Sequence, residues 1–165
     1  MPVLVSDTSV IIDLERARLL ERAFQLPHEL CVPDLLFERE LRGALGDQLL
    51  ALGLSVVELD PPELAEATRL GRRDASLSVA DTFAFALAKV RTWTLLTGDS
   101  GLRQAAAVEQ VEVHGALWVI DQLEICQICG SAELEAGLGR VAAHPRCRLP
   151  RAEITRRLNR FRGLG

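Results

Sequence analysis

Short apolar runs alternate along the chain with longer segments in which apolar residues recur at helical spacing. The short runs have the length and composition of buried strands and cover residues 3–5, 30–32, 55–59, 94–96 and 111–113. The helical patterns between them cover residues 10–24, 34–45, 61–72, 78–90 and 101–107. Strands that alternate with helices favour a parallel sheet with helices on both faces. The pattern therefore predicts a three-layer α/β/α fold with a mostly parallel sheet of about five strands.

Beyond Gly115 the pattern predicts only helices, over residues 117–125, 132–143 and 152–161. We therefore expect an α/β domain over residues 1–120 and a helical extension over residues 121–165 that packs on the same domain. A chain of 165 residues is long enough to bury a core without disulfide or metal staples.

The composition is that of an ordinary soluble protein, with 48% hydrophobic and 25% charged residues. No apolar stretch approaches the roughly 20 residues that a membrane-spanning helix needs. The first apolar run also lacks the preceding basic segment of a signal peptide. We therefore expect a cytoplasmic protein with no membrane partner.

Charge is distributed unevenly, although the net charge is only −4. Residues 140–165 contain eight arginines and one acid, whereas residues 1–139 contain 11 basic and 22 acidic residues. A basic terminal segment beside an acidic domain can attract phosphates. An equally good interpretation is a terminal helix that packs through Ile154, Leu158 and Phe161 and leaves its arginines in solvent.

Two acidic residues stand at the ends of predicted strands. Asp7 ends the first strand, in VLVSDTS, and Asp99 follows the fourth, in LLTGDSGL. In open parallel sheets the ligand site lies outside the carboxyl ends of the strands. Each acid also precedes a helix, so an N-cap is the alternative role for each.

Acids also interrupt two helices that are otherwise apolar. Asp81 lies in the first turn of the helix in SVADTFAFALAKV, where the helix dipole favours an acid. In PDLLFEREL, Glu38 and Glu40 both lie at the edges of the apolar face, and helical geometry does not choose between them. Carboxylates gathered in one cleft repel each other unless a cation binds. Such oxygen ligands suit Mg²⁺ or Mn²⁺, which can activate water for phosphodiester cleavage.

Together the segments VSDTSVIIDL, PDLLFEREL, LSVADTFAFALAK and LLTGDSGL resemble the acidic motifs of the PIN-domain family of metal-dependent ribonucleases. The resemblance implies a PIN-like nuclease domain and Mg²⁺ or Mn²⁺ as cofactor. It also implies that the catalytic, metal-binding carboxylates are Asp7, Glu40, Asp81 and Asp99. Glu40 fits better than Glu38 because the family has an aliphatic residue after this glutamate, although the choice between the two stays open.

What this resemblance implies is hydrolysis of RNA. We therefore expect RNA, single-stranded or structured, as the substrate. Many family members are toxins of toxin–antitoxin pairs, so the resemblance also implies a protein antitoxin as a partner. A homodimer is the expected assembly. A degenerate PIN fold that binds RNA or protein without cleavage is the alternative. Receiver domains and haloacid-dehalogenase-like phosphatases fit less well, because both need a lysine near the phosphate. The only lysine, Lys89, lies at the far end of its helix from Asp81.

Two further groups of residues have structural explanations. The spacing of one group suits a zinc site, namely Cys126, Cys129, His144 and Cys147. The first two end an apolar helix, however, where free cysteines behave as small hydrophobic residues. His114, Trp93 and Trp118 are interpreted as packing residues. With two Trp, five Phe and no Tyr, the chain predicts no aromatic platform for single-stranded nucleic acid.

Overall fold

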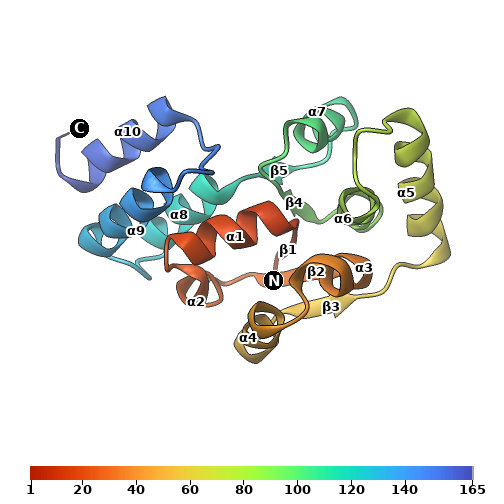
Figure 1. Ribbon diagram of the computed structural model, residues 1–165, viewed down its shortest axis with the longest axis horizontal. Helices are drawn as coiled ribbons and strands as arrows, with labels where there is room; N and C mark the ends of the chain where they lie inside the picture. The colour runs from red at the N-terminus through yellow and green to blue at the C-terminus, as the bar shows by residue number, and fades with distance from the viewer. Residues whose placement is uncertain (165) are drawn as a thin grey trace.

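Five short parallel strands form one sheet in the computed structural model, which describes residues 1–164 (Figure 1). The strands are β1 (Val3–Ser6), β2 (Glu29–Pro33), β3 (Ser55–Val57), β4 (Thr94–Leu96) and β5 (Val113–His114). Their order across the sheet is β3-β2-β1-β4-β5, and every neighbouring pair is parallel. The predicted α/β/α fold is therefore confirmed, with β1 at the centre.

Helices cover both faces of this sheet. They are α1 (Thr8–Arg16), α2 (Leu20–Ala23), α3 (Asp34–Leu36), α4 (Ala44–Leu52), α5 (Pro61–Arg73), α6 (Val79–Arg91), α7 (Ser100–Val108), α8 (Ala116–Ile125), α9 (Ser131–Ala143) and α10 (Arg151–Phe161), with a π-helical turn η1 (Phe37–Leu41). No helix within residues 1–164 is long and apolar enough to cross a membrane.

Two of the predicted helices are broken in the structure. The pattern over residues 10–24 divides into α1 and α2, because Arg18 adopts a left-handed backbone with φ of 57° and ends the first helix. The pattern over residues 34–45 becomes α3 and η1, and a new helix, α4, then starts after Gly43. Gly43 has φ of 120°, a conformation that favours glycine, so the chain turns there.

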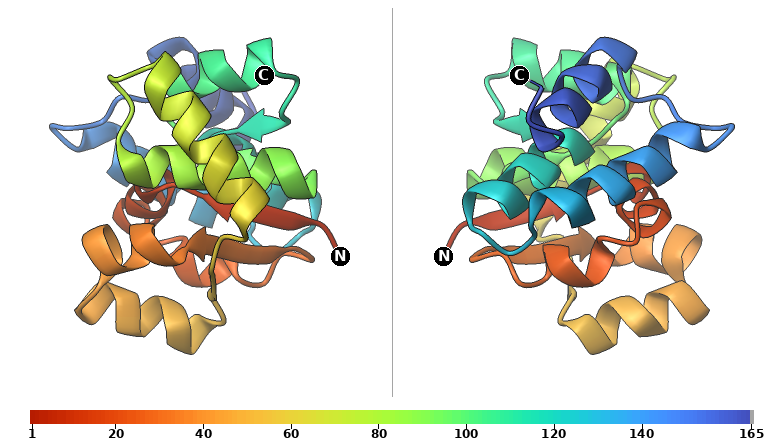
Figure 2. Two further views of the ribbon diagram at one scale, coloured as in Figure 1. Left: turned by 90° about the vertical axis from the view of Figure 1, so that its right-hand side faces the viewer. Right: turned by 90° about the vertical axis from the view of Figure 1, so that its left-hand side faces the viewer.

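Adjacent residues of each strand contribute to different cores. Leu4 of β1 and Leu96 of β4 face the core under α1, α2, α8 and α9, whereas Val5 and Leu95 face the core under α5, α6 and α7. Figure 2 shows α5 and α6 over one side of the sheet and α9 over the other. Both faces of β1 are therefore buried, and Asp7, the residue that follows the strand, is buried as well.

The C-terminal helices share the first of these cores. Ile154 and Phe161 of α10 are buried in it and Leu158 is partly buried against it, so the predicted packing of this helix is confirmed. Three arginines of this helix, Arg156, Arg157 and Arg160, form ion pairs, whereas the exposed Arg151 has no carboxylate partner within residues 1–164. Arg157 is only 7% exposed and donates to both carboxylate oxygens of Asp121, at 2.9 and 2.7 Å.

Other arginines of this region divide into two kinds. Arg156, Arg160 and Arg162 form ion pairs with acids of α8, α9 and α10. In the described part of the chain, Arg146 and Arg148 have no carboxylate partner, and both lie in the loop between α9 and α10. Arg140 of α9 and Arg151 of α10 also have no carboxylate partner within residues 1–164, although Arg140 donates to the Ala17 carbonyl oxygen.

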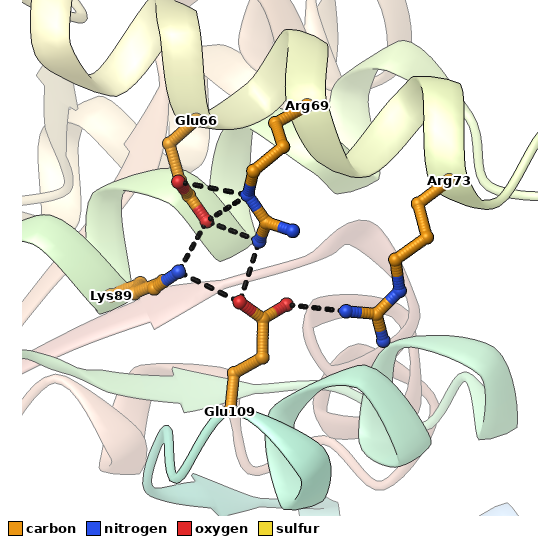
Figure 3. Close-up of polar contacts among 5 residues, drawn as sticks. All are labelled: Glu66, Arg69, Arg73, Lys89 and Glu109. Atoms are coloured by element: carbon orange, nitrogen blue, oxygen red, sulfur yellow. Dashed lines mark hydrogen bonds and ion pairs between the residues drawn. The ribbon is translucent and has the colours of Figure 1, made fainter.

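On the face of the sheet opposite α10, an ion-pair network joins α5, α6 and the end of α7 (Figure 3). Lys89 donates to Glu66 at 2.6 Å and to Glu109 at 2.7 Å, and Arg69 reaches the same two acids. Arg73 adds a further contact to Glu109 at 3.3 Å. These cations hold the pKa of Glu66 at about 2, well below its ordinary value. A connected network of this kind stabilises more than isolated surface pairs, which contribute about 0–1 kcal/mol each.

The approach of α9 to the turn after α1 gives a stability prediction. A methyl group on Gly137 would lie 2.9 Å from Leu19 and 3.0 Å from the Ala17 carbonyl oxygen, whereas a methyl group on Gly139 meets nothing within 4 Å. We expect Gly137→Ala to lower the free energy of unfolding by about 1–3 kcal/mol through overpacking. Gly139→Ala, in the same helix, should raise it by roughly 0.4–1 kcal/mol. Urea denaturation of both variants measures this, and equal effects would contradict the close approach.

Candidate active site

Asp7 lies where β1 ends and α1 begins, and its side chain is almost fully buried. The residue is 3% exposed. Its carboxylate accepts hydrogen bonds from the Val10 backbone N–H at 3.1 Å, from the Ser9 hydroxyl at 2.8 and 2.9 Å, and from the Thr97 hydroxyl. The Val10 bond makes Asp7 the N-cap of α1, as expected from the sequence. The Thr97 bond reaches across to the end of the neighbouring strand β4.

Burial raises the pKa of Asp7 from 3.8 to about 6. The hydrogen bonds from Thr97, Val10 and Ser9 act in the opposite direction, and the negative charge of Asp81 adds to the rise. Desolvation outweighs the hydrogen bonds because it disfavours the charged form of a carboxyl group. Asp7 is therefore a buried acid whose charge is incompletely compensated by the protein.

Asp99 lies beside Asp7 because β1 and β4 are hydrogen-bonded neighbours. The Thr97 hydroxyl, which donates to Asp7, also accepts the Asp99 backbone N–H at 3.0 Å, and the Gly98 N–H donates to Ser9 at 3.1 Å. The Asp99 carboxylate is exposed and caps α7 by accepting from the Leu102 N–H at 2.9 Å. The structure therefore brings these two acidic segments together at the carboxyl edge of the sheet.

Asp81 lies in the first turn of α6, and its charge acts on Asp7. It forms the predicted capping box with Ser78, whose hydroxyl accepts the Asp81 N–H at 3.0 Å, while the Ser78 N–H donates to the Asp81 carboxylate at 3.3 Å. Its negative charge raises the pKa of Asp7 and also that of Glu40. Asp81 therefore lies within electrostatic reach of both acids.

Glu38 and Glu40 differ in their surroundings although only one residue separates them. Both lie in η1, and π-helical turns are frequent at functional sites. Glu38 is exposed and forms an ion pair with Arg42 at 2.6 Å. Burial and then the charge of Asp81 raise the pKa of Glu40, while the nearby Thr8 hydroxyl lowers it. Both glutamates are exposed, but Glu40 lies within electrostatic reach of Asp81, whereas Glu38 is paired with Arg42.

The oxygen donors of this region suit a hard divalent cation, although they do not form a ready coordination shell. Within residues 1–164, no three acid, histidine or cysteine side chains come close enough to hold a metal ion. Asp7 and Glu40 nevertheless have raised pKa values, which a cation would lower. The buried Thr8 Oγ1 also has no hydrogen-bond partner of good geometry. These features fit a cation that binds the acids after their side chains adjust.

A cavity of about 290 Å³ opens beside Asp99. Ser9, Asp13 and Gly98 line it together with arginines of α1 and of the α9–α10 loop, namely Arg16, Arg146 and Arg148. Asp13 was not predicted as a site residue, and the signal for it is an acid within the apolar run of α1. Burial raises the pKa of Asp13, while Arg16 and His144 lower it. Acidic and basic groups therefore meet at the mouth of the site.

The family model for PIN domains matches residues 3–162. The chain belongs to the PIN-domain family. No curated protein gives a significant match to it. The matched region includes α8, α9 and most of the chain after residue 120, so the C-terminal helices lie within the family pattern. The fold of this PIN domain is accordingly of the nuclease type.

Two cysteines of the alternative zinc site lie just after α8. Cys126 is exposed and Cys129 is buried, both in the turn that follows α8. Burial, with Glu133 nearby, raises the pKa of Cys129 to about 11, which disfavours the thiolate that zinc requires. In the part of the chain that the structure describes, the candidate ligands Cys126, Cys129, His144 and Cys147 supply no metal-binding group. Their interpretation as structural residues stays a prediction.

The raised pKa of Asp7 predicts how its removal changes stability with pH. Because the folded-state pKa of about 6 exceeds the ordinary 3.8, protonated Asp7 favours the folded state, and stability is lost as pH rises between about 4 and 6. Asp7→Asn can still accept from Val10 and carries no charge. We expect the free energy of unfolding of this variant to exceed that of wild type by about 1–3 kcal/mol at pH 7. Below pH 4 the two free energies of unfolding should be equal.

Urea denaturation across this pH range, with EDTA present, measures the difference. A stability difference that does not change with pH would contradict the burial of an ionisable Asp7.

Proposed function

We propose that this PIN-domain protein is a divalent-metal-dependent endoribonuclease that hydrolyses RNA phosphodiester bonds. One observation carries the proposal. The Thr97 hydroxyl joins the Asp7 carboxylate to the backbone of Asp99, and Asp81 lies within electrostatic reach of Asp7 at the same sheet edge. Ligand sites of open parallel sheets lie at this edge.

Each acid has a role in the proposed mechanism. Asp7 and Asp99 would be the central ligands of Mg²⁺ or Mn²⁺, and Asp81 and Glu40 would complete the site directly or through water. When bound, such an ion supplies a water of lowered pKa and stabilises charge on the leaving oxygen. Ser9 and Thr97 orient the Asp7 carboxylate by their hydrogen bonds.

Cationic groups at the mouth of the site suit an RNA substrate. Arg146 and Arg148 line the cavity beside Asp99 and have no carboxylate partner within residues 1–164. Unpaired arginines attract phosphates and steer an anionic chain toward an otherwise acidic cleft. The loop between α9 and α10, rather than the paired arginines of α10, is therefore the proposed steering element.

The proposal extends to biological context on the basis of the family resemblance. A toxin of a toxin–antitoxin pair would act on cytoplasmic RNA, would be held inactive by a protein antitoxin, and would fit the homodimer expected from the resemblance. Co-expression with the product of an adjacent small reading frame tests this part: relief of growth arrest supports it, and no growth arrest on expression alone argues against a toxin.

A second candidate is a PIN fold that binds RNA without cleaving it. The observation that favours it is that Asp7, Asp81 and Asp99 each cap a helix, so their carboxylates already have a structural role. Binding of Mn²⁺ without RNA cleavage would favour this candidate over the nuclease.

Asparagine variants test the nuclease. We expect Asp7→Asn and Asp99→Asn to lose at least about 10- to 100-fold of Mn²⁺-dependent RNA cleavage, because groups one shell further from a metal already contribute that much. Asp47→Asn is the control, since Asp47 is exposed on α4 and forms no ion pair within residues 1–164. Cleavage of a labelled RNA measures the rates, and equal activity in all variants would identify a contaminating nuclease.

The two glutamates of η1 form a matched pair for a second test. Glu40→Gln should reduce Mn²⁺-dependent cleavage by about 10-fold or more, because it removes a carboxylate that would complete the metal site directly or through water. Glu38→Gln should leave cleavage unchanged, because it removes only the surface pair with Arg42. The reverse order of effects would assign the site glutamate to Glu38.

A further inference from the structure

A second cavity, of about 440 Å³, continues the one beside Asp99. Both cavities are lined by Gly98, Arg148 and Leu149, so they form one groove. The groove leads from the acidic sheet edge to the end of β5 and the start of α8, where His114 and Trp118 line it. A substrate strand bound at Asp99 would therefore have room to continue in this direction.

His114 and Trp118 stack face to face beside the groove, so each ring covers one face of the other. Their rings are parallel, with an interplanar angle of 8° and centroids 4.3 Å apart. Trp118 is held in place because it packs against the core and because the His28 ring lies at 77° to it, with ring centroids 5.9 Å apart. Both residues were interpreted from the sequence as packing residues, and this interpretation was incomplete: they are half-buried and line a cavity.

The charges in this part of the groove leave a net cationic surface. Arg157 is already paired with Asp121 and Glu153, so these three groups satisfy one another. Arg103 donates to the Thr97 carbonyl oxygen at 2.9 Å and has no carboxylate partner among residues 1–164, and neither has Arg148. The groups available to a ligand are therefore two arginines and the outer face of the stacked ring pair.

We propose that this groove binds one unpaired nucleotide of an RNA strand, with the base stacked on the outer face of the His114–Trp118 pair and a phosphate at Arg148. The proposal rests on the proposed function, because the groove begins at the candidate nuclease site. Aromatic rings beside a cationic groove are the means by which proteins hold single strands without reading their sequence.

The chemistry distinguishes an unpaired nucleotide from other occupants. The cavity volume lies in the range of about 300–1,000 Å³ found for small-ligand pockets. Bases in a double helix are stacked on one another and do not offer a free face to a side chain. The acids of the groove are already paired, which leaves Arg103 and Arg148 for an anionic ligand such as a phosphate.

The two tryptophans provide an internal control for the test. Trp93→Phe leaves Trp118 as the only tryptophan, whereas Trp118→Phe leaves Trp93, which lies under Arg91 on the other side of the sheet. Each protein is titrated in EDTA, where metal-dependent cleavage cannot occur, with short oligoadenylate or with an abasic oligomer of the same length and charge. A base that extends the His114–Trp118 stack quenches the fluorescence of Trp118.

We expect oligoadenylate to quench Trp118 emission and to leave Trp93 emission unchanged. The abasic oligomer should bind about 5- to 150-fold more weakly, the range that loss of one stacked base gives. Equal affinity for both oligomers, no quenching of Trp118, or no binding would each overturn the proposal. Quenching without cleavage when Mn²⁺ is added would leave the proposal intact and reject the nuclease instead, so the two failures are distinct.

A surface variant tests the phosphate contact without disturbing the core. Arg148 is exposed, so Arg148→Ala should fold normally and should lower the salt dependence of oligoadenylate binding by about one unit of slope. Arg156→Ala is the matched control, because Arg156 is an exposed arginine already paired with Glu153 at 2.5 Å. An unchanged slope in Arg148→Ala would remove this residue from the nucleotide site.

Discussion

The burial of one carboxylate, that of Asp7, constrains the centre of this protein. Removing an ionised carboxylate from water is unfavourable by several kcal/mol unless hydrogen bonds replace the lost solvent. Here the donors come from α1 itself and from the residue after β4, so the start of a helix and the spacing of two strands must both be correct. The same bonds place Asp99 beside Asp7. Folding of the sheet edge and assembly of the candidate site are thus one event.

Helix capping and cation binding would both use the carboxylate oxygens of Asp7. The two roles are compatible because the hydrogen-bond donors to this carboxylate are of two kinds. The Asp7 carboxylate accepts from one backbone N–H and from two hydroxyl groups. The backbone donor is fixed by α1, whereas hydroxyl groups of Ser9 and Thr97 rotate about a single bond and can turn their lone pairs toward a cation. A cation would therefore replace the hydroxyl donors while the helix keeps its cap.

Most of the fold could be predicted from the sequence, but only part of the candidate site could. Alternation of apolar runs located every strand, because a buried parallel strand has a strong signal. It did not reveal the break at Arg18 or the helix after Gly43, since both depend on backbone angles that many sequences can adopt. The contrast between Glu38 and Glu40 required the π-helical turn, and the stacking of His114 on Trp118 required tertiary packing. Local patterns identify acids at strand ends; they do not identify which side chains share a groove.

The ion-pair network of α5, α6 and α7 has a consequence for the chemical reactivity of the protein. Lys89 is the only lysine in the sequence, and it is held by two glutamates that raise its pKa. An ammonium group that stays protonated and paired is a poor nucleophile, because acylating reagents need the free amine. The folded protein therefore offers amine-directed cross-linkers, dyes and acetyl donors almost no reactive side chain, and modification of Lys89 would report the opening of this network.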